Sequence, residues 1–323
     1  MDRTGALTGD PAQRAVVGAV RRFADRHRLT RIAVGLSGGA DSLALTAAAV
    51  RSGLDVHAVV VDHALQHGSD RVAHDAADTA RTLGATAEIR SVTVDADGGP
   101  EAAARRARYA ALDAARDGRP VLLGHTLDDQ AETVLLGLGR GSGARSLAGM
   151  RPWRPPWGRP LLDVRRAQTR DACRGWGLPV WDDPHNVDPR FTRVRLRTEV
   201  LPLLDDVLGG GVADALARTA TQLRDDADAL DEPADRLLAE TAHDRALRID
   251  ALDGRPTALR TRVLRRWLIS IGAVEPGHRT VSAVDALVTH WHGQGPIAVG
   301  GDADHRLVVE RVGGDLTARR IPR

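Results

Sequence analysis

The feature that most constrains the fold is a short glycine-rich segment. It lies between an apolar run, residues 31–36, and a helical pattern, residues 42–51, and it consists of Ser37, Gly38, Gly39, Ala40, Asp41 and Ser42. Paired glycines let the backbone turn sharply and approach an anion closely. The N-terminus of the next helix offers free N–H groups and a positive dipole end. The segment predicts a phosphate-binding loop in an α/β fold. The alternative is an ordinary glycine-rich turn with Asp41 or Ser42 as a helix cap, which a bare pair of glycines would favour and the full segment does not.

This loop has to bind phosphate without lysine. All 45 basic residues of the 323-residue chain are arginine, and the pI is about 9.4 although the net charge is only +2. A Walker-type P-loop needs a lysine on the phosphates, and Schiff-base catalysis needs a lysine amine, so both classes are excluded. The carboxylate of Asp41 would repel phosphate unless a divalent cation lay between them. The loop therefore also predicts Mg²⁺ bound at Asp41.

Apolar segments alternate with helical patterns through the first two thirds of the chain. Strands are expected over residues 31–36, 56–61, 86–94 and 121–123, and helices over 11–28, 42–51, 72–83, 101–116 and 127–138. The alternation predicts a parallel sheet with helices on both faces, a Rossmann-like α/β fold. Ligands of such sheets bind at the carboxyl ends of the strands, so the residues that follow each strand are the candidates for a site.

A smaller, mainly helical domain is expected at the C-terminal end. The glycines at 209–211 separate an N-terminal catalytic domain, residues 1–208, from a C-terminal domain, residues 212–323. Before this break, the proline- and tryptophan-rich segment 151–159 is expected to lack regular structure, and residues 189–204 are expected to form a helix. After it, we expect helices over 212–230, 257–271 and 280–290, and short strands near 297–299 and 307–309.

Arginine is concentrated in one part of the chain. Residues 140–197 contain thirteen arginines and five acidic residues, whereas residues 221–245 are acidic. A basic stretch in a nearly neutral protein favours a polyanionic partner. Surface arginines that are paired with acidic side chains would give the same composition, so the charge pattern leaves both interpretations open.

A second group of polar residues follows the strand expected at 121–123. His125, Asp129 and Glu132 are spaced so that they share one face at the start of the next helix, and Asp128 lies beside them. Such a group suits a metal ion or an organic cation such as the ammonium of lysine. Acidic residues at a helix N-terminus also complement the helix dipole, which would explain Asp128 but not His125.

Several motifs occur in order along the chain. They are SGGADS at 37–42, VDHAL at 61–65, EAAARRARY at 101–109, HTLDDQAET at 125–133, RGSG at 140–143 and DPHN at 183–186. Together they resemble the tRNA(Ile)-lysidine synthetase family of PP-loop (N-type) ATP pyrophosphatases. Two positions depart from the family pattern, with Gln66 where arginine is usual and Val194 where asparagine is usual.

The resemblance implies a reaction and a set of residues. The reaction is ATP-dependent ligation of L-lysine to C2 of the wobble cytidine (C34) in the CAU anticodon of tRNA(Ile), through an adenylated cytidine, with release of AMP and pyrophosphate; the product reads AUA instead of AUG. Asp129 and Glu132 would bind lysine, and Mg²⁺ would accompany ATP. The remaining expected roles are catalysis by Asp41, Arg105 and His125, ATP binding by residues 37–42 and His63, and tRNA binding by Arg193, Arg197, Arg265 and Arg266.

Other functions fit the sequence less well. A tRNA thiolase needs cysteines for sulfur transfer or an iron–sulfur cluster, and a glutamine-fed amidotransferase needs a cysteine glutaminase, but Cys173 is the only cysteine. A non-catalytic nucleotide-binding protein would have no need of the acidic HTLDDQAET face. Residues 1–15 carry charges and no continuous apolar core, and no apolar run approaches a membrane span, so we expect a cytoplasmic protein.

Overall fold

The chain divides into two compact units between Thr221 and Gln222. The computed structural model describes residues 10–63, 68–93, 100–141 and 143–323. The glycines at 209–211 separate α9 (Leu201–Leu208) from α10 (Val212–Thr241) as expected, but the division between the units falls inside α10. A helix needs no break to pass from one packed unit to another, which is why the glycines did not mark the boundary.

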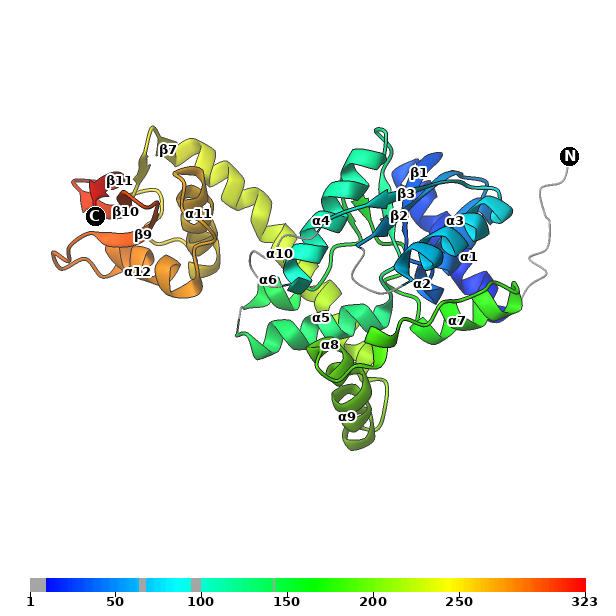
Figure 1. Ribbon diagram of the computed structural model, residues 1–323. Helices are drawn as coiled ribbons and strands as arrows, with labels where there is room; N and C mark the ends of the chain where they lie inside the picture. Colours follow the sequence, from blue (N-terminus) through cyan, green and yellow to red (C-terminus); the bar gives the residue numbers. More distant parts are fainter. Residues whose placement is uncertain (1–9, 64–67, 94–99, 142) are drawn as a thin grey trace, which may run out of the picture. The chain divides into compact units, whose positions relative to one another are not determined.

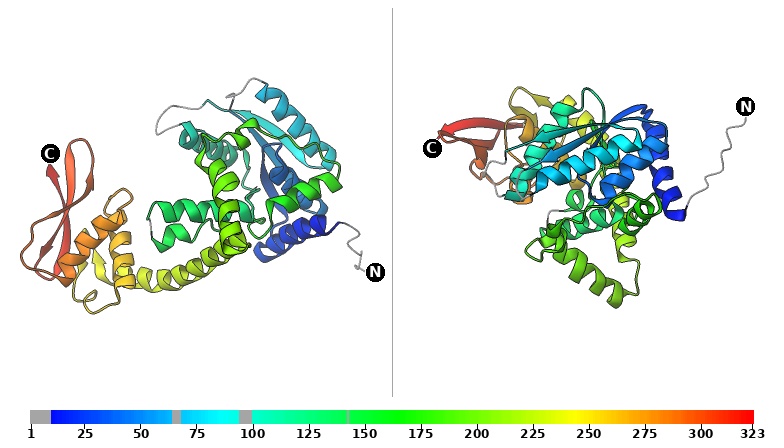
Figure 2. Two further views of the ribbon diagram at one scale, coloured as in Figure 1. Left: turned by 90° about the horizontal axis from the view of Figure 1, so that it is seen from below. Right: turned by 45° about the vertical axis from the view of Figure 1, so that its right-hand side comes forward.

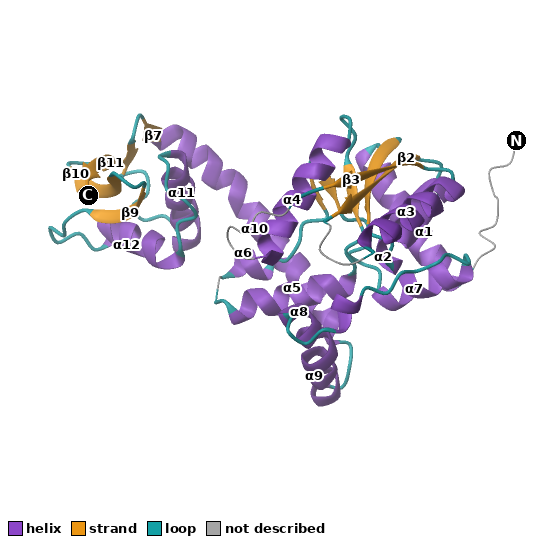
Figure 3. Ribbon diagram, in the orientation of Figure 1, coloured by secondary structure: helices purple, strands orange, loops and turns teal. Residues whose placement is uncertain are grey.

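The first unit contains a six-stranded sheet with the order β3-β2-β1-β4-β6-β5. All neighbouring strands are parallel except β5 and β6, which pair antiparallel at the edge. The orange strands of Figure 3 show this sheet enclosed by purple helices. The strands are β1 (Arg31–Leu36), β2 (Asp55–Asp62), β3 (Thr86–Ser91), β4 (Val121–Leu123), β5 (Trp153–Arg154) and β6 (Trp157–Gly158).

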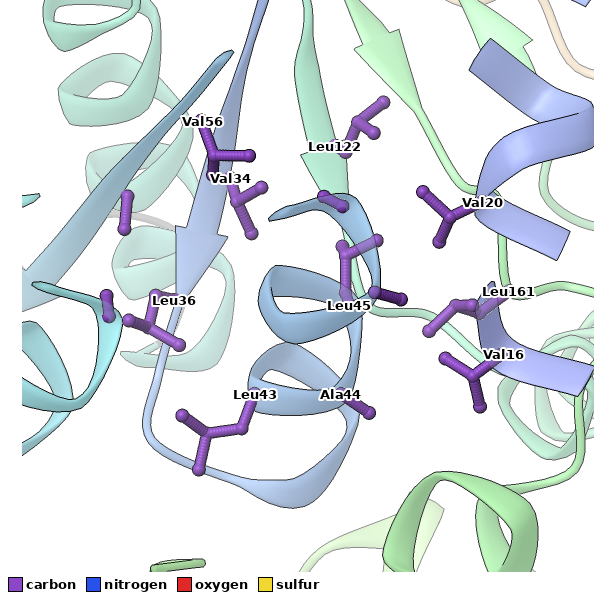
Figure 4. Packing of buried hydrophobic residues seen from close by; sticks show 14 of the residues in the cluster. Val16, Val20, Val34, Leu36, Leu43, Ala44, Leu45, Val56, Leu122 and Leu161 are labelled. Atoms are coloured by element: carbon purple, nitrogen blue, oxygen red, sulfur yellow. The ribbon is translucent and has the colours of Figure 1, made fainter. Parts of the chain in front are cut away.

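Helices cover both faces of the sheet, as the apolar character of the strands predicts. Alternate residues of β1 point to opposite faces. Ile32 and Val34 lie in the larger core, and Ala33 lies in the smaller one. Figure 4 shows Val34 and Leu36 packed in the larger core. Residues of α1 (Pro11–His27), α2 (Ala40–Arg51), α3 (Ser69–Leu83) and α7 (Arg166–Gly175) complete the larger core. The smaller core is completed by α4 (Pro100–Ala115).

The segment 151–159 is ordered, contrary to expectation. Trp153–Arg154 and Trp157–Gly158 pair as β5 and β6, joined by a turn at Pro155 and Pro156, and β6 extends the parallel sheet beside β4. Both prolines lie in the turn, outside the strand pairs, so the sheet does not need the N–H group that proline lacks. The indole of Trp153 stacks on His27, and Trp157 packs on Tyr109.

Helical segments follow β4 and complete the first unit (Figure 1). The long α5 (Leu127–Gly139) agrees with expectation, whereas residues 189–204 do not form one α-helix. Proline lacks an N–H, and Pro202 lies in the first turn of α9, which follows a π-helical turn. The shorter segments are α6 (Ala144–Leu147), η1 (Pro184–Val187), α8 (Thr192–Arg195) and η2 (Leu196–Val200).

The second unit combines three helices with an antiparallel sheet of order β7-β8-β11-β10-β9 (Figure 2). The helix expected over 212–230 is the first part of the longer α10, and the other two expected helices are present as α11 (Thr257–Ser270) and α12 (His278–Thr289). Trp267 and Leu264 of α11 are fully buried. The sheet is larger than the two short strands expected. Its strands are β7 (Ala242–His243), β8 (Ala246–Arg248), β9 (Ile297–Gly301), β10 (His305–Val312) and β11 (Asp315–Pro322). Among the described residues, no helix is long and apolar enough to cross a bilayer.

Candidate active site

A pocket of about 440 Å³ lies in the first unit, at the carboxyl ends of β1, β2 and β4. The residues that follow these three strands line it, as the parallel topology predicts. They are joined by side chains from α2, α4 and α5. The polar lining includes Ser37, Asp41, Ser42, His63, Arg108, His125 and Asp129.

The glycine-rich loop has the geometry of an anion-binding turn. Gly38 has a φ of +80°, which favours glycine, and Gly39 is the N-cap of α2 with no side-chain hydrogen bond. Ser42 Oγ instead accepts from the Ser37 N–H at 3.1 Å and donates to the Gly39 carbonyl at 3.0 Å. The alternative of a helix cap by Asp41 or Ser42 is therefore not formed, and the first N–H groups of α2 have no side-chain cap competing for them.

Asp41 points into the pocket from the first turn of α2. It accepts a hydrogen bond from Thr169 of α7, and Arg166 Nε lies 3.6 Å from its Oδ2. Burial and the nearby charge of Asp129 raise the pKa of the Asp41 carboxyl. Its negative charge is thus incompletely compensated, and a cation beside it would be stabilised.

The acidic start of α5 is neutralised by an arginine that the sequence analysis did not single out. Arg166 lies 2.6 Å from Asp129 Oδ1 and 3.2 Å from Glu132 Oε1. Asp129 Oδ2 accepts from both the N–H and the hydroxyl of Thr126, each at 2.8 Å. Burial alone would raise the pKa of Asp129, but Arg166, His125 and Thr126 outweigh it and hold this pKa below its ordinary value.

Asp129 and Glu132 share a helix face but not an environment. Asp129 lines the pocket, whereas Glu132 is fully buried and absent from the pocket wall. Glu132 also pairs with Arg197 at 2.9 Å and with Arg193 at 3.8 Å. Glu132 is therefore the centre of an arginine cluster, and only Asp129 presents its carboxylate to a ligand in the pocket.

Asp128 has a structural role, as the helix-dipole interpretation suggested. Its Oδ2 accepts from the Arg166 backbone N–H at 2.7 Å, at the first turn of α7, and its Oδ1 lies 3.1 Å from Arg165 Nη2. Arg165 in turn pairs with Asp214 at 2.8 Å. These contacts fix the start of α7 and hence the position of Arg166 and Thr169.

Two histidines of the pocket are held neutral. Burial, with the nearby Arg108, lowers the pKa of His63. For His125, burial outweighs the attraction of Asp129 and lowers the pKa to about 3. The Nδ1 atoms of both rings are buried and have no hydrogen-bond partner among the described residues. Each ring can therefore accept or donate a hydrogen bond to a ligand, but neither carries a charge at neutral pH.

The arginine in the pocket is Arg108 and not Arg105. Arg105 is exposed, donates to Tyr109 Oη at 3.0 Å and lies over the Tyr109 ring. Arg108 lines the pocket, where burial and the charges of Arg105 and Arg159 lower its pKa. The helical spacing allowed either residue to face inward, and the packing of α4 selects Arg108.

Of the two positions that depart from the family pattern, the structure describes Val194 but not Gln66. Val194 is buried in α8, between Arg193 and Arg195. An apolar side chain suits this position, because a buried amide would need its own hydrogen-bond partners. Gln66 lies outside the described residues.

Comparison with known proteins identifies the family. A PP-loop domain matches residues 13–204, and a TilS substrate binding domain matches residues 247–317. A tRNA(Ile)-lysidine synthase of Nocardia farcinica is 62% identical over 90% of this chain and 92% of its own length. The chain belongs to the tRNA(Ile)-lysidine synthase family. A synthase of Mycobacterium tuberculosis is 57% identical over the full length of both chains.

Solved structures support the same fold for this lysidine synthase family member. A U34-tRNA thiolase, NcsA, from Methanococcus maripaludis, described with its 4Fe-4S cluster, aligns over 66% of this chain and 79% of its own, with a TM-score of 0.54 and 18% identity. This likeness confirms the α/β architecture of the PP-loop unit. The matches to both family domains make the chain a ligase-type enzyme with an ATP-binding unit and a substrate-binding unit.

The arginines expected to bind tRNA occupy two different settings in this lysidine synthase family member. Arg193 and Arg197 contact Glu132, beside the pocket. Arg266 of α11 pairs with Asp231 at 2.9 Å and with Asp235 at 2.6 Å, and is largely covered. The alternative of paired surface charges therefore describes Arg266. The sequence spacing predicted that several arginines lie close together on α11. It did not predict that acidic residues of α10 form ion pairs with them.

Proposed function

We propose that this protein ligates L-lysine to C2 of the wobble cytidine of tRNA(Ile) with a CAU anticodon. The observation that carries the proposal is that one pocket is lined both by groups for an anion and by a carboxylate for a cation. The phosphate-binding loop and Arg108 line it together with Asp129 and the neutral His125. An anion and a cation thus have adjacent places, as an ATP-dependent ligation to an amine requires.

In the first step, O2 of the cytidine attacks the α-phosphorus of ATP. The O2–P bond forms as the bond to the β-phosphate oxygen breaks, and pyrophosphate leaves with the electron pair. Backbone N–H groups of the loop and the guanidinium of Arg108 stabilise the charge on the phosphates. We propose that Arg105 acts only from outside the pocket, through its contact with Tyr109.

Mg²⁺ fits this site through Asp41. Magnesium in nucleotide sites is held by one or two carboxylates, with phosphates and water completing its shell. Asp41 is such a carboxylate, and burial, with the nearby charge of Asp129, raises its pKa, so that a further cation beside it would be stabilised. Among the residues that the structure describes, no group of three His, Cys, Asp or Glu could hold a metal, so ATP would supply further ligands. The ion would neutralise charge on the phosphates.

In the second step, the lysine ε-amine attacks C2. The N–C2 bond forms, the C2–O2 bond breaks, AMP leaves with the former base oxygen, and the amine releases a proton. Asp129 binds the ammonium group as lysine enters. Before lysine binds, Arg166 links Asp129 to Glu132. His125 remains neutral and offers a hydrogen bond to the substrate. The cytidine must leave its stack to reach the pocket.

The cysteine chemistry of a thiolase is not supported by the site. Cys173 is buried, donates to the Ala40 carbonyl at 3.3 Å, and burial raises the pKa of its thiol to about 12. A thiol in this state forms almost no thiolate at neutral pH.

Pyrophosphate release tests the proposal. We expect release from ATP only when tRNA(Ile) with a CAU anticodon is present, and lysine incorporation only when free lysine is added. A tRNA with a different wobble base and the amino acids arginine and ornithine serve as controls. Release of pyrophosphate with every tRNA, or incorporation of a different amino acid, would contradict the substrate assignment.

A further inference from the structure

We infer that Arg166 is the resident counter-ion of the lysine site, and that the substrate's ammonium group displaces it from Asp129. The inference rests on the proposed function, because it assigns the entry of lysine to the place that Arg166 now fills. Arg166 is the first residue of α7, outside every sequence motif that identified the site.

The contacts of Arg166 place one guanidinium among three carboxylates. Its Nη2 lies 2.6 Å from Asp129 Oδ1, its Nη1 3.2 Å from Glu132 Oε1, and its Nε 3.6 Å from Asp41 Oδ2. Two of these carboxylates, Asp41 and Asp129, line the pocket. The guanidinium thus lies behind the pocket wall and pairs with two carboxylates that an incoming cation in the pocket could also contact.

Asp129 has only one oxygen to offer a cation. Its Oδ2 already accepts two hydrogen bonds from Thr126, so Oδ1 is the atom that an ammonium group would contact. Arg166 occupies that oxygen. An ammonium bound there as well would place two positive charges within a few ångströms, which is strongly repulsive in a partly buried site. Lysine binding and the Arg166–Asp129 bond are therefore competing events.

Glu132 does not need Arg166 to remain compensated. Arg197 contacts it at 2.9 Å and Arg193 at 3.8 Å, so its charge stays paired after Arg166 leaves Asp129. The arrangement keeps Asp129 paired while the pocket is empty and makes binding of unspecific cations to this carboxylate unfavourable. A ligand has to reach Oδ1 with its own cation to replace the guanidinium, which selects amino acids with a long cationic side chain.

Lysine binding to Arg166 variants tests the inference. Isothermal titration of lysine into the full-length protein gives Kd directly, and the KM for lysine gives a second value. We expect R166Q, which removes the competing charge, to lower the Kd by about tenfold. R166K keeps a positive charge at this position and should bind lysine as the wild type does. R174Q removes an exposed arginine of the same helix and should leave the Kd unchanged.

A purely structural Arg166 would give the opposite sign, because its loss would loosen the site and raise the Kd. An unchanged or raised Kd in folded R166Q overturns the inference. If R166Q does not fold, a crystal structure of the wild-type protein with bound lysine tests the inference. The distance between the Arg166 guanidinium nitrogens and Asp129 Oδ1 should then exceed about 4 Å. An intact Arg166–Asp129 ion pair in that structure overturns the inference. Failure of the proposed function can be told apart from failure of this inference, because the wild-type protein would then not incorporate lysine into tRNA at all.

Discussion

Single residues of the site differ in what they do even where the sequence makes them look alike. Asp129 and Glu132 belong to one motif and one helix face, but Asp129 lines the pocket and Glu132 is fully buried among arginines. Spacing along a helix predicts a shared face. It does not predict the partners that arrive from distant segments, and Arg166 and Arg197 lie 34 and 65 residues beyond Glu132 in the chain.

Substitution of the two acids should therefore have different effects. D129N should raise the KM for lysine while tRNA-dependent pyrophosphate release persists, because Asp129 faces the ligand. E132Q should destabilise the fold by about 1–3 kcal/mol, because it removes the buried carboxylate that three partly exposed arginines share. Chemical denaturation and lysine kinetics measure the two effects. Equal loss of stability in both variants would contradict this division of roles.

Asp41 should be important for catalysis and unimportant for stability. Its raised pKa means that the folded protein disfavours the charged form, so above the ordinary pKa its charge costs stability. D41N should abolish pyrophosphate release and leave Tm unchanged or higher. A variant with a lowered Tm, or one that retains turnover, would remove the case for Asp41 as the metal ligand.

His125 should make stability depend on pH. Its pKa is about 3 in the folded protein and about 6.5 in the unfolded chain, so the unfolded state binds the extra proton between these values. The free energy of unfolding should fall as pH decreases below about 6.5, at up to about 1.4 kcal/mol per pH unit. Denaturation of wild type and H125Q from neutral to mildly acidic pH isolates this residue. If the free energy of unfolding depended on pH in the same way in both proteins, His125 would not be the source of the pH dependence.

At the level of elements, the periodicity of the sequence predicted most of the first unit and missed the helix that completes the site. Strands and helices from α1 to α5 agree because their apolar residues alternate or recur at helical spacing. The helix α7 was not predicted, since its buried face consists of small residues such as Thr169, Ala172 and Cys173 within an arginine-rich segment. Its role depends on tertiary contacts that the pattern does not encode.

The junction between β4 and α2 gives an element-scale prediction. A Cβ at Gly124 would lie 2.9 Å from the backbone carbonyl of Asp41, so the loop after β4 packs directly on the start of α2. G124A should cost about 1–3 kcal/mol of stability and lower the rate of pyrophosphate release, because the phosphate loop must shift. G139A meets nothing within 4 Å and is the matched control. Equal stability of the two variants would show that the junction is not tightly packed.

At the level of the whole molecule, selection among tRNAs requires more surface than one pocket. The second unit carries the match to a substrate binding domain. A protein that ends at Thr221 would lack this unit but keep the start of α10, whose Val212, Ala213 and Ala217 pack in the first unit. Removing residues 222–323 should weaken tRNA binding and flatten its salt dependence, by about 0.7–0.9 in logarithmic slope for each phosphate that the second unit neutralises. ATP binding should persist. Filter binding at several salt concentrations measures this, and an unchanged slope would show that the first unit alone binds the tRNA phosphates.

The central claim concerns the chemical fate of one base. The most direct measurement is mass spectrometry of nucleosides from tRNA(Ile) with a CAU anticodon after incubation with the purified protein, ATP, Mg²⁺ and isotopically labelled lysine. The account predicts loss of one cytidine per tRNA and a new nucleoside with the mass of cytidine plus labelled lysine minus water. An unmodified wobble cytidine, or a new nucleoside without the label, would contradict it.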